Sequence, residues 1–587
     1  MPSKSTRAIP LISFIFFFTL SYNLSREYLS VKEVFPPPQS LKPSTLLTPN
    51  PNRPPDLEPI PPAPHNSNPP NYAVIQERNQ HPYDNRLFPH DHHHHLANLS
   101  TNSISILLPD WEVLFIASPE TSVSGDVNLC LFEFNKTSPA KFAGVLPSTN
   151  QKTFLCVLPN RVRMFRPMLM PILIESVPSE FHLSGNELLR WSYLVCESLS
   201  TENDVVLFAK GLNNRQGINR SPSEFNCIFG DNESNAVRTA VTSSSQEVFR
   251  CLHPEPTALT SVTTKISLEI RSDQQKKFVV PSVAYYNGRP QRAIEKSERK
   301  SLLCACTMVY NVAKVLKEWV VYHFRIGVEK FILYDNGGDD ELERIVDELS
   351  REGYDVKSRY WPWAKMQEAG FSHCAVQNKD SCSWMMFVDV DEFLFSPAWL
   401  NSDSPSNGML KSLLPSPGKP NGPNKSRIGQ VSIKCLEFGP SNQTAHPKNG
   451  VTQGYTCRRK VDQRHKSIVL LEAMDITLLN VIHHFVLKEG YRSKYLGLSR
   501  AVVNHYKYQA WPEFKTKFRR RVSAYVVDWK DAVNPRSQDR TPGLGFSPVE
   551  PKGWAQMFCE VEDKRLKELA VRWFGIETSS GYHLPWE

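Results

Sequence analysis

The 587-residue sequence lacks several patterns that are typical of common classes of protein. Its 12 cysteines include no Cys-x-x-Cys pair, which argues against zinc domains and favours disulfide bonds. The net charge of +8 is moderate for this length, and no concentrated basic stripe accompanies a DNA- or RNA-binding motif. Nucleic acid is therefore not an expected partner. Anionic partners such as a nucleotide diphosphate or an acidic polysaccharide remain compatible with this charge.

The apolar run Ala8–Leu24 contains no charged residue and lacks a clean small-residue cleavage site. Lys4 and Arg7 precede it, and basic residues before an apolar span predict a cytoplasmic N-terminus and a lumenal remainder. We expect a cytoplasmic tail over 1–7 and a signal anchor over 8–24, with a cleaved signal peptide as the alternative. The span is short, which suits the thinner bilayers of the early secretory pathway.

Sequons and cysteines both fit a lumenal location. Seven Asn-x-Ser/Thr sequons occur, at Asn23, Asn98, Asn135, Asn219, Asn232, Asn424 and Asn442. Five cysteines lie before residue 290 and seven after it. Because both counts are odd, either one disulfide joins the two parts or each part keeps a free thiol.

Two segments of different composition follow the apolar run. Between Pro36 and Pro70, 14 of 35 residues are proline, which predicts an extended, semi-rigid stem over 25–103. The His-rich tract at 90–95 is more typical of a linker than of a metal site. From 104 to 290, short apolar runs alternate with Pro, Asn, Gly and Ser clusters, which predicts an all-β, sandwich-like domain. It shows no constellation of catalytic side chains, so we expect a binding or packing module.

From about residue 298 the pattern changes to an alternation of strands and helices. We predict strands over 301–310, 328–334, 354–360 and 384–390, with helices beginning at 312 and spanning 341–352 and 367–377. This α/β alternation predicts a largely parallel sheet with helices on both faces.

The stretch FVDVDEFLF (387–395) places two aspartates at the end of an apolar strand. Open α/β sheets bind ligands at the carboxyl ends of their strands, and Asp389 and Asp391 would point to the same side of a strand. Two such carboxylates repel each other unless a cation lies between them, and Mg²⁺ or Mn²⁺ holding a diphosphate fits best. Phe393 and Leu394 exclude an EF-hand loop. A paired-carboxylate glycosidase and a turn-capping aspartate pair remain open alternatives.

Five stretches together resemble glycosyltransferase family 92. They are 306–340 (beginning CTMVYNVAKV and ending YDNGGDD), 366–378 (MQEAGFSHCAVQN), 383–395 (SWMMFVDVDEFLF), 465–469 (HKSIV) and 502–521 (VVNHYKYQAWPEFKTKFRRR). Within the family, the chain is most similar to the plant β-1,4-galactan synthases.

This resemblance implies a Rossmann-like GT-A catalytic domain over 298–587, a nucleotide-sugar donor and a metal-dependent inverting transfer. The galactan synthases further imply UDP-galactose as donor and β-1,4-galactan side chains of pectic rhamnogalacturonan I as acceptor, in cell-wall biosynthesis. They also imply a single-pass type II protein of the Golgi membrane, a carbohydrate-binding β-domain and a homodimer. The alternatives are a transferase of the same fold that uses another sugar, such as UDP-arabinopyranose, and a non-catalytic polysaccharide-binding protein.

The resemblance also suggests roles for single residues around the metal. Asp391 would bind the metal directly, and Asp389 would reach the ribose or reach the metal through water. Glu392 would either orient these groups or hold the turn. A late histidine is the usual third ligand; His505 ends an apolar strand and is preferred over His484 and His483.

The remaining assignments concern the donor, the base and a helix. Asn311 and Asp335 end the first two strands, where a uridine would lie. Lys466 and Lys507 match family positions that could hold the diphosphate. An inverting transfer needs a base, for which we name Glu437, with Asp475 and Glu472 as rivals. Residues 514–525 predict an amphipathic helix with a basic face.

Overall fold

The computed structural model describes the chain from residue 103 onward, except residues 119–128, 177–184, 214–218, 232–233, 260, 262, 272–276, 291–298, 416–425, 482, 517–549 and 580. Within these described parts, no helix combines the length and apolarity needed to cross a membrane. Several expectations lie outside the described residues: the tail, the anchor, the stem, the histidine tract, four sequons (Asn23, Asn98, Asn232 and Asn424) and the basic helix beyond residue 516.

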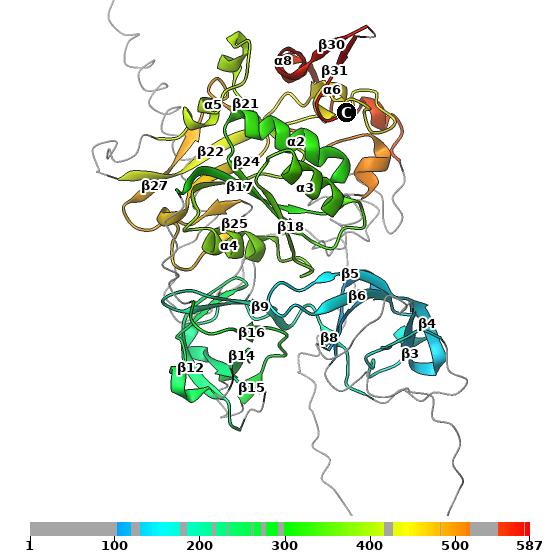
Figure 1. The fold of residues 1–587 in the computed structure, drawn as a ribbon, viewed down its shortest axis with the longest axis vertical. Helices are drawn as coiled ribbons and strands as arrows, with labels where there is room; N and C mark the ends of the chain where they lie inside the picture. The colour runs from blue at the N-terminus through cyan, green and yellow to red at the C-terminus, as the bar shows by residue number, and fades with distance from the viewer. Residues whose placement is uncertain are drawn as a thin grey trace, which may run out of the picture. The chain divides into compact units, whose positions relative to one another are not determined.

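The first β-rich segment folds around two small sheets (Figure 1). The five-stranded sheet has the order β5-β6-β2-β1-β8, and the three-stranded sheet has the order β4-β3-β7. The strands are β1 (Ile104–Leu107), β2 (Glu112–Ile116), β3 (Leu129–Phe132), β4 (Lys136–Pro139), β5 (Lys141–Val145), β6 (Lys152–Val157), β7 (Ile172–Ile174) and β8 (Leu189–Arg190). Val113, Phe132 and Leu173 help to form the core between these sheets, and a Cys130–Cys156 disulfide joins β3 to β6.

A second β-rich segment forms an eight-stranded sheet. Its strands are β9 (Leu194–Ser200), β10 (Val205–Lys210), β11 (Phe225–Phe229), β12 (Val237–Ser245), β13 (Val248–Cys251), β14 (Thr264–Arg271), β15 (Lys277–Val279) and β16 (Tyr285–Tyr286). It has its own core, which includes Leu207, Phe225 and Leu268, and its own disulfide, Cys227–Cys251. Strand content is therefore as predicted over 104–290, but it is divided between two cores.

A nine-stranded mixed sheet organises the rest of the chain. Its order is β19-β18-β17-β20-β24-β22-β28-β21, with β27 beside β22. The strands are β17 (Ser301–Val309), β18 (Lys330–Asp335), β19 (Val356–Tyr360), β20 (Cys382–Phe387), β21 (Glu392–Phe395), β22 (Arg427–Glu437), β24 (His465–Leu470), β27 (Tyr491–Leu496) and β28 (Val502–His505). The four strands from β19 to β20 are parallel, as predicted, whereas β24 runs antiparallel to both β20 and β22.

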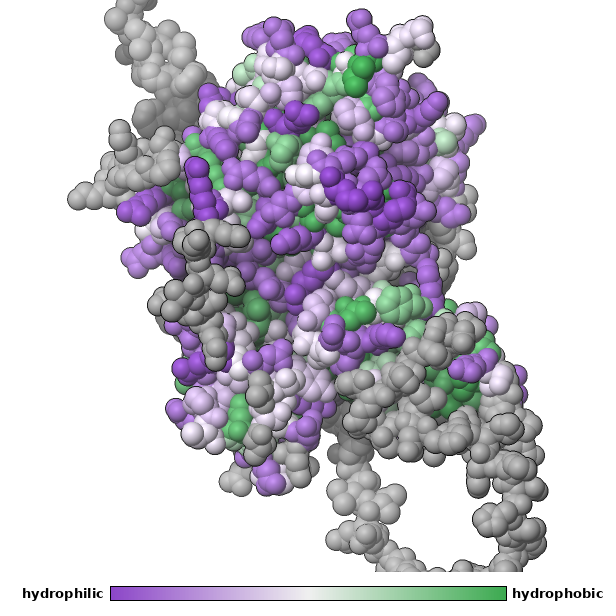
Figure 2. Space-filling view, viewed as in Figure 1, coloured by the Kyte–Doolittle hydropathy of each residue, from purple (hydrophilic) through white to green (hydrophobic). Residues whose placement is uncertain are grey.

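Helices pack on both faces of this sheet. On one face, α2 (Ala313–Ile326) and α3 (Leu342–Arg351) lie side by side over β17 and β18 (Figure 1). On the other face, α4 (Gln367–Gln377) packs through Phe371 against Phe387. α2 ends at Gly327, whose φ of 122° and close approach to the Asn407 carbonyl oxygen leave no room for a Cβ. Figure 2 shows that the outer surface over α2 and α3 is largely hydrophilic.

Short elements complete the described part of the chain. They are α5 (Gly408–Lys411), α6 (Val451–Gly454), β23 (Cys457–Arg458), β25 (Asn480–Val481), β26 (His484–Phe485), β29 (Val561–Glu562), α8 (Arg565–Phe574), β30 (Ile576–Thr578) and β31 (Gly581–His583).

All 12 cysteines are described, and ten of them form disulfides. Besides the two in the β-rich segments, the pairs are Cys304–Cys382, Cys306–Cys374 and Cys457–Cys559. Cys196 and Cys435 are free and buried. Each part of the chain therefore keeps one free thiol, and no disulfide joins the β-rich segments to the α/β part.

Candidate active site

The acidic motif lies in a turn between two strands of the sheet. β20 ends at Phe387 and β21 begins at Glu392, so the prediction of a strand that continues to residue 390 was wrong. Two hydrogen bonds hold this turn. The Glu392 amide donates to the Asp389 carbonyl at 3.0 Å, and the Asp389 amide donates to Glu392 Oε2 at 2.9 Å. Satisfying these backbone groups locally stabilises the turn and leaves both aspartates at the sheet edge.

The pairing of β21 with β28 brings His505 to the acidic motif. Glu392 and His505 are direct antiparallel partners, so their side chains point to the same side of the sheet. The Tyr506 amide donates to the Asp391 carbonyl at 2.9 Å, which ties the turn to the end of β28. The sequence-based choice of His505 as the partner of Asp391 therefore agrees with the position of both residues.

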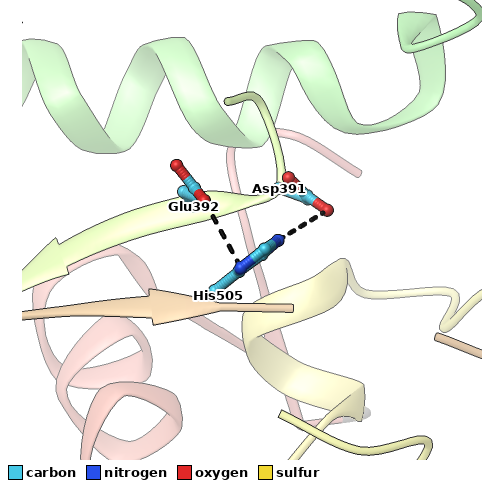
Figure 3. A group of neighbouring side chains, drawn as sticks. All are labelled: Asp391, Glu392 and His505. Carbon is cyan, nitrogen blue, oxygen red and sulfur yellow. Dashed lines mark ion pairs between the residues drawn. The ribbon is translucent and has the colours of Figure 1, made fainter. Parts of the chain in front are cut away.

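Asp391, Glu392 and His505 form a cluster whose donor atoms lie within 4.8 Å of one another (Figure 3). His505 Nε2 is 3.6 Å from Asp391 Oδ2, and His505 Nδ1 is 3.4 Å from Glu392 Oε1. The two ring nitrogens thus face different carboxylates, as the dashed lines in Figure 3 show. The Nε2–Oδ2 separation exceeds a normal hydrogen bond, and two metal–ligand bonds of about 2 Å each could span it. These donors fit a divalent cation.

Glu392 is completely buried behind this cluster. Its Oε2 accepts the Asp389 amide, and its Oε1 lies 3.0 Å from Lys466 Nζ as well as near His505. Burial raises the pKa of Glu392 against the lowering effect of Lys466. Its backbone carbonyl accepts the Trp319 indole N–H at 3.0 Å, which anchors the start of β21 to α2. The residue therefore supports the turn and faces the histidine at the same time.

Lys466 is the cation of this cluster. Its Nζ lies 2.7 Å from Asp389 Oδ2 and 2.6 Å from His483 Nε2. Burial opposes ionisation of Asp389, yet the Lys466 ammonium holds the pKa of Asp389 at about 2. Burial also lowers the pKa of His483 well below its ordinary value, so its neutral ring accepts a hydrogen bond from the Lys466 ammonium. Lys466 therefore occupies Asp389 Oδ2. Asp389 precedes Asp391 by two positions, and Asp391 faces His505 instead.

Glu437 and Lys507 form a second buried pair beside His505. Glu437 is the parallel partner of His505, and Lys507 Nζ donates to Glu437 Oε1 at 2.6 Å. Arg459 Nη1 lies 3.3 Å from Glu437 Oε2. Burial would raise the pKa of Glu437, but Lys507 reverses this and His505 and Arg459 contribute, so the pKa lies below its ordinary value. Both predicted residues are thus near the cluster, and they neutralise each other.

Asp475, Glu472 and Asn311 have hydrogen-bond partners outside the Asp391–His505 cluster. Asp475 Oδ1 accepts the amide and the hydroxyl of Thr477, and Glu472 Oε1 accepts the Tyr491 hydroxyl at 3.4 Å. Asn311 Nδ2 donates to Asp339 Oδ1 at 2.6 Å, and its Oδ1 accepts the Asp339 amide at 2.7 Å.

Asp335 ends β18 on the sheet edge where β20 also ends, because β18, β17 and β20 are parallel. Its Oδ1 accepts the Gly338 amide at 3.1 Å. Burial raises the pKa of Asp335 to about 6, with the nearby Glu343 and Asp340 adding to the effect.

His484 lies apart from Asp391, in a stack with His465 and Tyr495. Sequence reasoning did not assign a role to Tyr495 or to Arg459. Tyr495 follows polar residues in an edge strand, and Arg459 belongs to a basic run, so neither position carries a distinguishing pattern.

Known proteins share this part of the chain. The sequence model of glycosyltransferase family 92 matches residues 299–538. A family 92 protein of Arabidopsis thaliana is 43% identical over 405 residues, which cover 68% of this chain and 69% of that protein. A family 92 protein of Ricinus communis is 42% identical over 407 residues, with the same coverage. The chain belongs to glycosyltransferase family 92. It is therefore a glycosyltransferase, as the resemblance implied.

Two more distant similarities accompany this family 92 membership. A galactan β-1,4-galactosyltransferase of Arabidopsis thaliana is 30% identical over 107 residues, or 16% of this chain and 21% of that protein. Among solved structures, a mannosyltransferase of Pyrobaculum calidifontis in complex with GDP-mannose and Mn²⁺ covers 40% of this chain and 64% of its own, at 10% identity and a TM-score of 0.23.

Proposed function

We propose that this family 92 glycosyltransferase transfers galactose from UDP-galactose to β-1,4-galactan side chains of rhamnogalacturonan I. We further propose a GT-A arrangement, an inverting reaction and a requirement for a divalent metal. The observation that carries the metal requirement is the position of His505 Nε2, 3.6 Å from Asp391 Oδ2 at the edge of the sheet. The short similarity to a galactan β-1,4-galactosyltransferase supports the choice of sugar and acceptor.

Asp391 and His505 would hold the metal, and this mixed oxygen and nitrogen donor set favours Mn²⁺ over Mg²⁺. When bound, the ion would offset negative charge on the departing nucleoside diphosphate. Glu392 faces Nδ1 of His505 and so leaves Nε2 turned toward Asp391. Lys466 neutralises Asp389 and Glu392 and keeps three carboxylates compatible in one buried turn.

The donor would lie along the edge formed by β17, β18 and β20. Asp335, at the end of β18, presents a carboxyl group that can accept a hydroxyl of the ribose. Asn311, after the end of β17, is engaged with Asp339 through both its Nδ2 and its Oδ1. Asn311 would therefore shape this edge, or exchange one of its two hydrogen bonds with Asp339 for a hydrogen bond to the uracil ring of the donor. In this proposal Lys466 holds the diphosphate directly, which requires its Nζ to exchange the Asp389 carboxylate for a phosphate oxygen.

Glu437 is our proposed base for the acceptor hydroxyl. Its register with His505 places it one strand from the metal ligands. Its pairing with Lys507 lowers the basicity of Glu437. Proton transfer to Glu437 would therefore require the Lys507 ammonium to leave Glu437 for the negative charge that develops on the departing diphosphate. Lys507 can do so if it turns toward the diphosphate, as the family resemblance implies. Glu437→Gln should therefore abolish transfer to acceptor but leave slow donor hydrolysis.

We also propose a Golgi location, type II, with the described residues in the lumen and two copies in a homodimer. Five disulfides support an oxidising compartment. Protease protection in sealed Golgi vesicles tests the topology. Digestion of the catalytic part without detergent would contradict it.

A donor and acceptor panel tests the proposed reaction. The full-length chain, purified in detergent, is incubated with UDP-galactose, UDP-arabinopyranose or UDP-glucose, a β-1,4-galacto-oligosaccharide and Mn²⁺, with and without EDTA. Extension by one hexose from UDP-galactose, lost with EDTA and restored by Mn²⁺, is the expected mass-spectrometric result. Extension that persists in EDTA would disprove the metal requirement.

The donor sugar has an alternative. The relatives at 42–43% identity carry only the family name, and the galactan similarity covers 16% of the chain. UDP-arabinopyranose, or another nucleotide sugar, is therefore the alternative, and a pentose mass increment in the same panel would establish it. Any donor hydrolysis or transfer would eliminate a purely polysaccharide-binding role.

A further inference from the structure

Three aromatic rings pack together from β26, β24 and β27, of which β24 and β27 lie on either side of β22. His484 of β26 lies with its ring centroid 4.1 Å from that of His465 at the start of β24. Tyr495 of β27 stacks on the other side, with its centroid 5.6 Å from that of His465 and the planes inclined by 27°. None of the contacts in the Asp391–His505 cluster uses these rings.

Hydrogen bonds hold this aromatic stack in place. His484 Nε2 donates to the His465 carbonyl at 3.1 Å. Gln430 of β22 joins the two outer strands, because its Nε2 donates to Ser493 Oγ of β27 and its Oε1 accepts the Phe485 amide of β26. Burial lowers the pKa of His465 and that of His484, the latter to about 3, so both rings are uncharged at neutral pH.

Tyr495 exposes the stack to solvent. Its side chain is 58% exposed, while His465 and His484 are partly buried beneath it. β27 pairs with β22 on one side, and no strand pairs with its other side in the described part of the chain. Arg492 and Lys494, which flank Tyr495 on the same strand, are exposed and polar. A single open ring among polar neighbours differs from the contiguous apolar patch of a typical protein interface.

Two residues of the stack are sequence neighbours of residues in the metal cluster. His465 precedes Lys466, whose Nζ binds Asp389 Oδ2 at 2.7 Å. His484 follows His483, which lies against the same Lys466 Nζ at 2.6 Å. Two adjacent residue pairs therefore each place one side chain in the charged cluster and the other in the stack. Because successive side chains of a strand point to opposite faces, His465 and Lys466 diverge from β24, just as Ile468 and Val469 of the same strand belong to different cores.

We propose that Tyr495, supported by His465 and His484, is a subsite that stacks against an uncharged sugar ring of the acceptor glycan. This rests on the proposed function only in naming the bound chain an acceptor. The aromatic ring offers a flat, polarisable face to the C–H face of a sugar. The neutral histidine rings below give the tyrosine a rigid support without adding charge.

Three variants and one probe test the subsite. The variants are Tyr495→Ala, Tyr495→Phe and, as a matched exposed aromatic on another edge strand, Phe278→Ala. The probe is β-1,4-galactopentaose, whose affinity for the full-length chain is measured by calorimetric titration in the absence of donor. We expect Tyr495→Ala to weaken binding about three- to tenfold, and Tyr495→Phe and Phe278→Ala to leave it unchanged.

Catalytic measurements separate this subsite from the proposed reaction. Tyr495→Ala should raise KM for the pentasaccharide by the same factor and leave UDP release from UDP-galactose without acceptor unchanged. Unaltered pentasaccharide affinity in Tyr495→Ala would overturn the subsite, even if galactosyl transfer is confirmed. If another sugar proves to be transferred, the Tyr495-dependent binding of the pentasaccharide still decides the inference. Tighter binding of an oligogalacturonide that ignores Tyr495, or a shift in oligomeric state in Tyr495→Ala, would also overturn it, in favour of an acidic ligand or a second copy.

Discussion

Glu392 serves several neighbours from one buried position. It accepts the amide of Asp389, lies 3.0 Å from Lys466 Nζ and faces His505 Nδ1 at 3.4 Å. A histidine whose second nitrogen is fixed by a carboxylate presents its first nitrogen in a defined tautomer and direction. We therefore regard Glu392 as a positioning residue for His505, with Asp391 as the carboxylate that meets the ion.

Glu392→Gln should weaken Mn²⁺ binding without removing it. Loss of the negative charge next to Nδ1 makes His505 a poorer ligand, and such changes typically cost about 10- to 100-fold in metal affinity. Mn²⁺ titration followed by electron paramagnetic resonance measures this directly. Asp391→Asn should abolish binding, and Asp380→Asn, an exposed aspartate elsewhere, is the control. Equal affinity in Glu392→Gln and the native chain would assign Glu392 to the turn alone.

Asp335 should make stability depend on pH. Because burial raises its pKa from 3.8 to about 6, the folded protein binds this proton more tightly than the unfolded chain. The free energy of unfolding therefore falls as pH rises from about 4 to about 6, and it stays reduced above that range. Asp335→Asn avoids the penalty, so it should be more stable at pH 7.5 by on the order of 1 kcal/mol, yet bind UDP less tightly.

Urea unfolding at pH 4.5 and 7.5, paired with UDP titration, measures both effects of Asp335→Asn. Asp403→Asn is a suitable surface control. If the difference in free energy of unfolding between Asp335→Asn and the native chain is the same at both pH values, Asp335 ionises without cost to stability.

At the scale of elements, α2 links the sheet to the N-terminus of the short helix α6. Glu318 of α2 is buried, and its carboxylate accepts the Val451 amide at 2.7 Å and the Thr452 amide at 3.0 Å. Gly450 precedes these amides with a φ of 100°, and a Cβ there would lie 2.5 Å from Glu318 Oε2. The loop can approach the helix this closely only because it contains glycine at this point.

Gly450→Ala should therefore destabilise the protein by about 1–3 kcal/mol, from the left-handed backbone strain, plus the displacement of Glu318. Chemical denaturation measures the change. Gly185→Ala, where a Cβ meets nothing within 4 Å, should be neutral. A neutral Gly450→Ala would mean that α6 shifts away without loss.

Periodicity predicted helices better than it predicted the ends of strands. The i, i+3, i+4 spacing from Val312 to His323 gave α2, and α4 has the predicted bounds of 367–377. The acidic motif was placed on a strand because its apolar neighbours extend the pattern past Phe387, where hydrogen bonds of Glu392 close a turn instead. His505 could be chosen because it ends an apolar strand. The pairing of Lys466 with Asp389, and of Lys507 with Glu437, depends on strand register, which spacing along one chain does not reveal.

At the scale of the whole molecule, disulfides reinforce each part separately. Cys304 and Cys306 of β17 connect to Cys382 at the start of β20 and to Cys374 of α4, so both elements before the acidic turn are fastened to the central strand. The two β-rich cores hold one disulfide each. The division of 104–290 into two cores was not predictable, because an alternating apolar pattern predicts a strand but does not indicate which sheet that strand joins.

The protein should contain two free thiols, and neither should react in the folded state. Cys196 and Cys435 are buried, whereas the other ten cysteines are paired. Thiol titration of the protein should find none in buffer and two in denaturant. Replacing Cys306 and Cys374 by serine should lower stability by about 2–4 kcal/mol, because their disulfide closes a loop of 68 residues. More than two thiols in denaturant would contradict the pairing.

The pairing of β21 with β28 also has an evolutionary consequence. Asp391 and His505 are far apart in sequence, but one short ladder sets their separation, and the long chain between them returns to the same place regardless of its own length. That intervening segment carries β22, β24 and the exposed ring of Tyr495. Relatives can therefore vary the edge strand β27 and change which glycan they extend, whereas β22 and β24 must keep their places because they supply Glu437 and Lys466 beside the cation-binding pair.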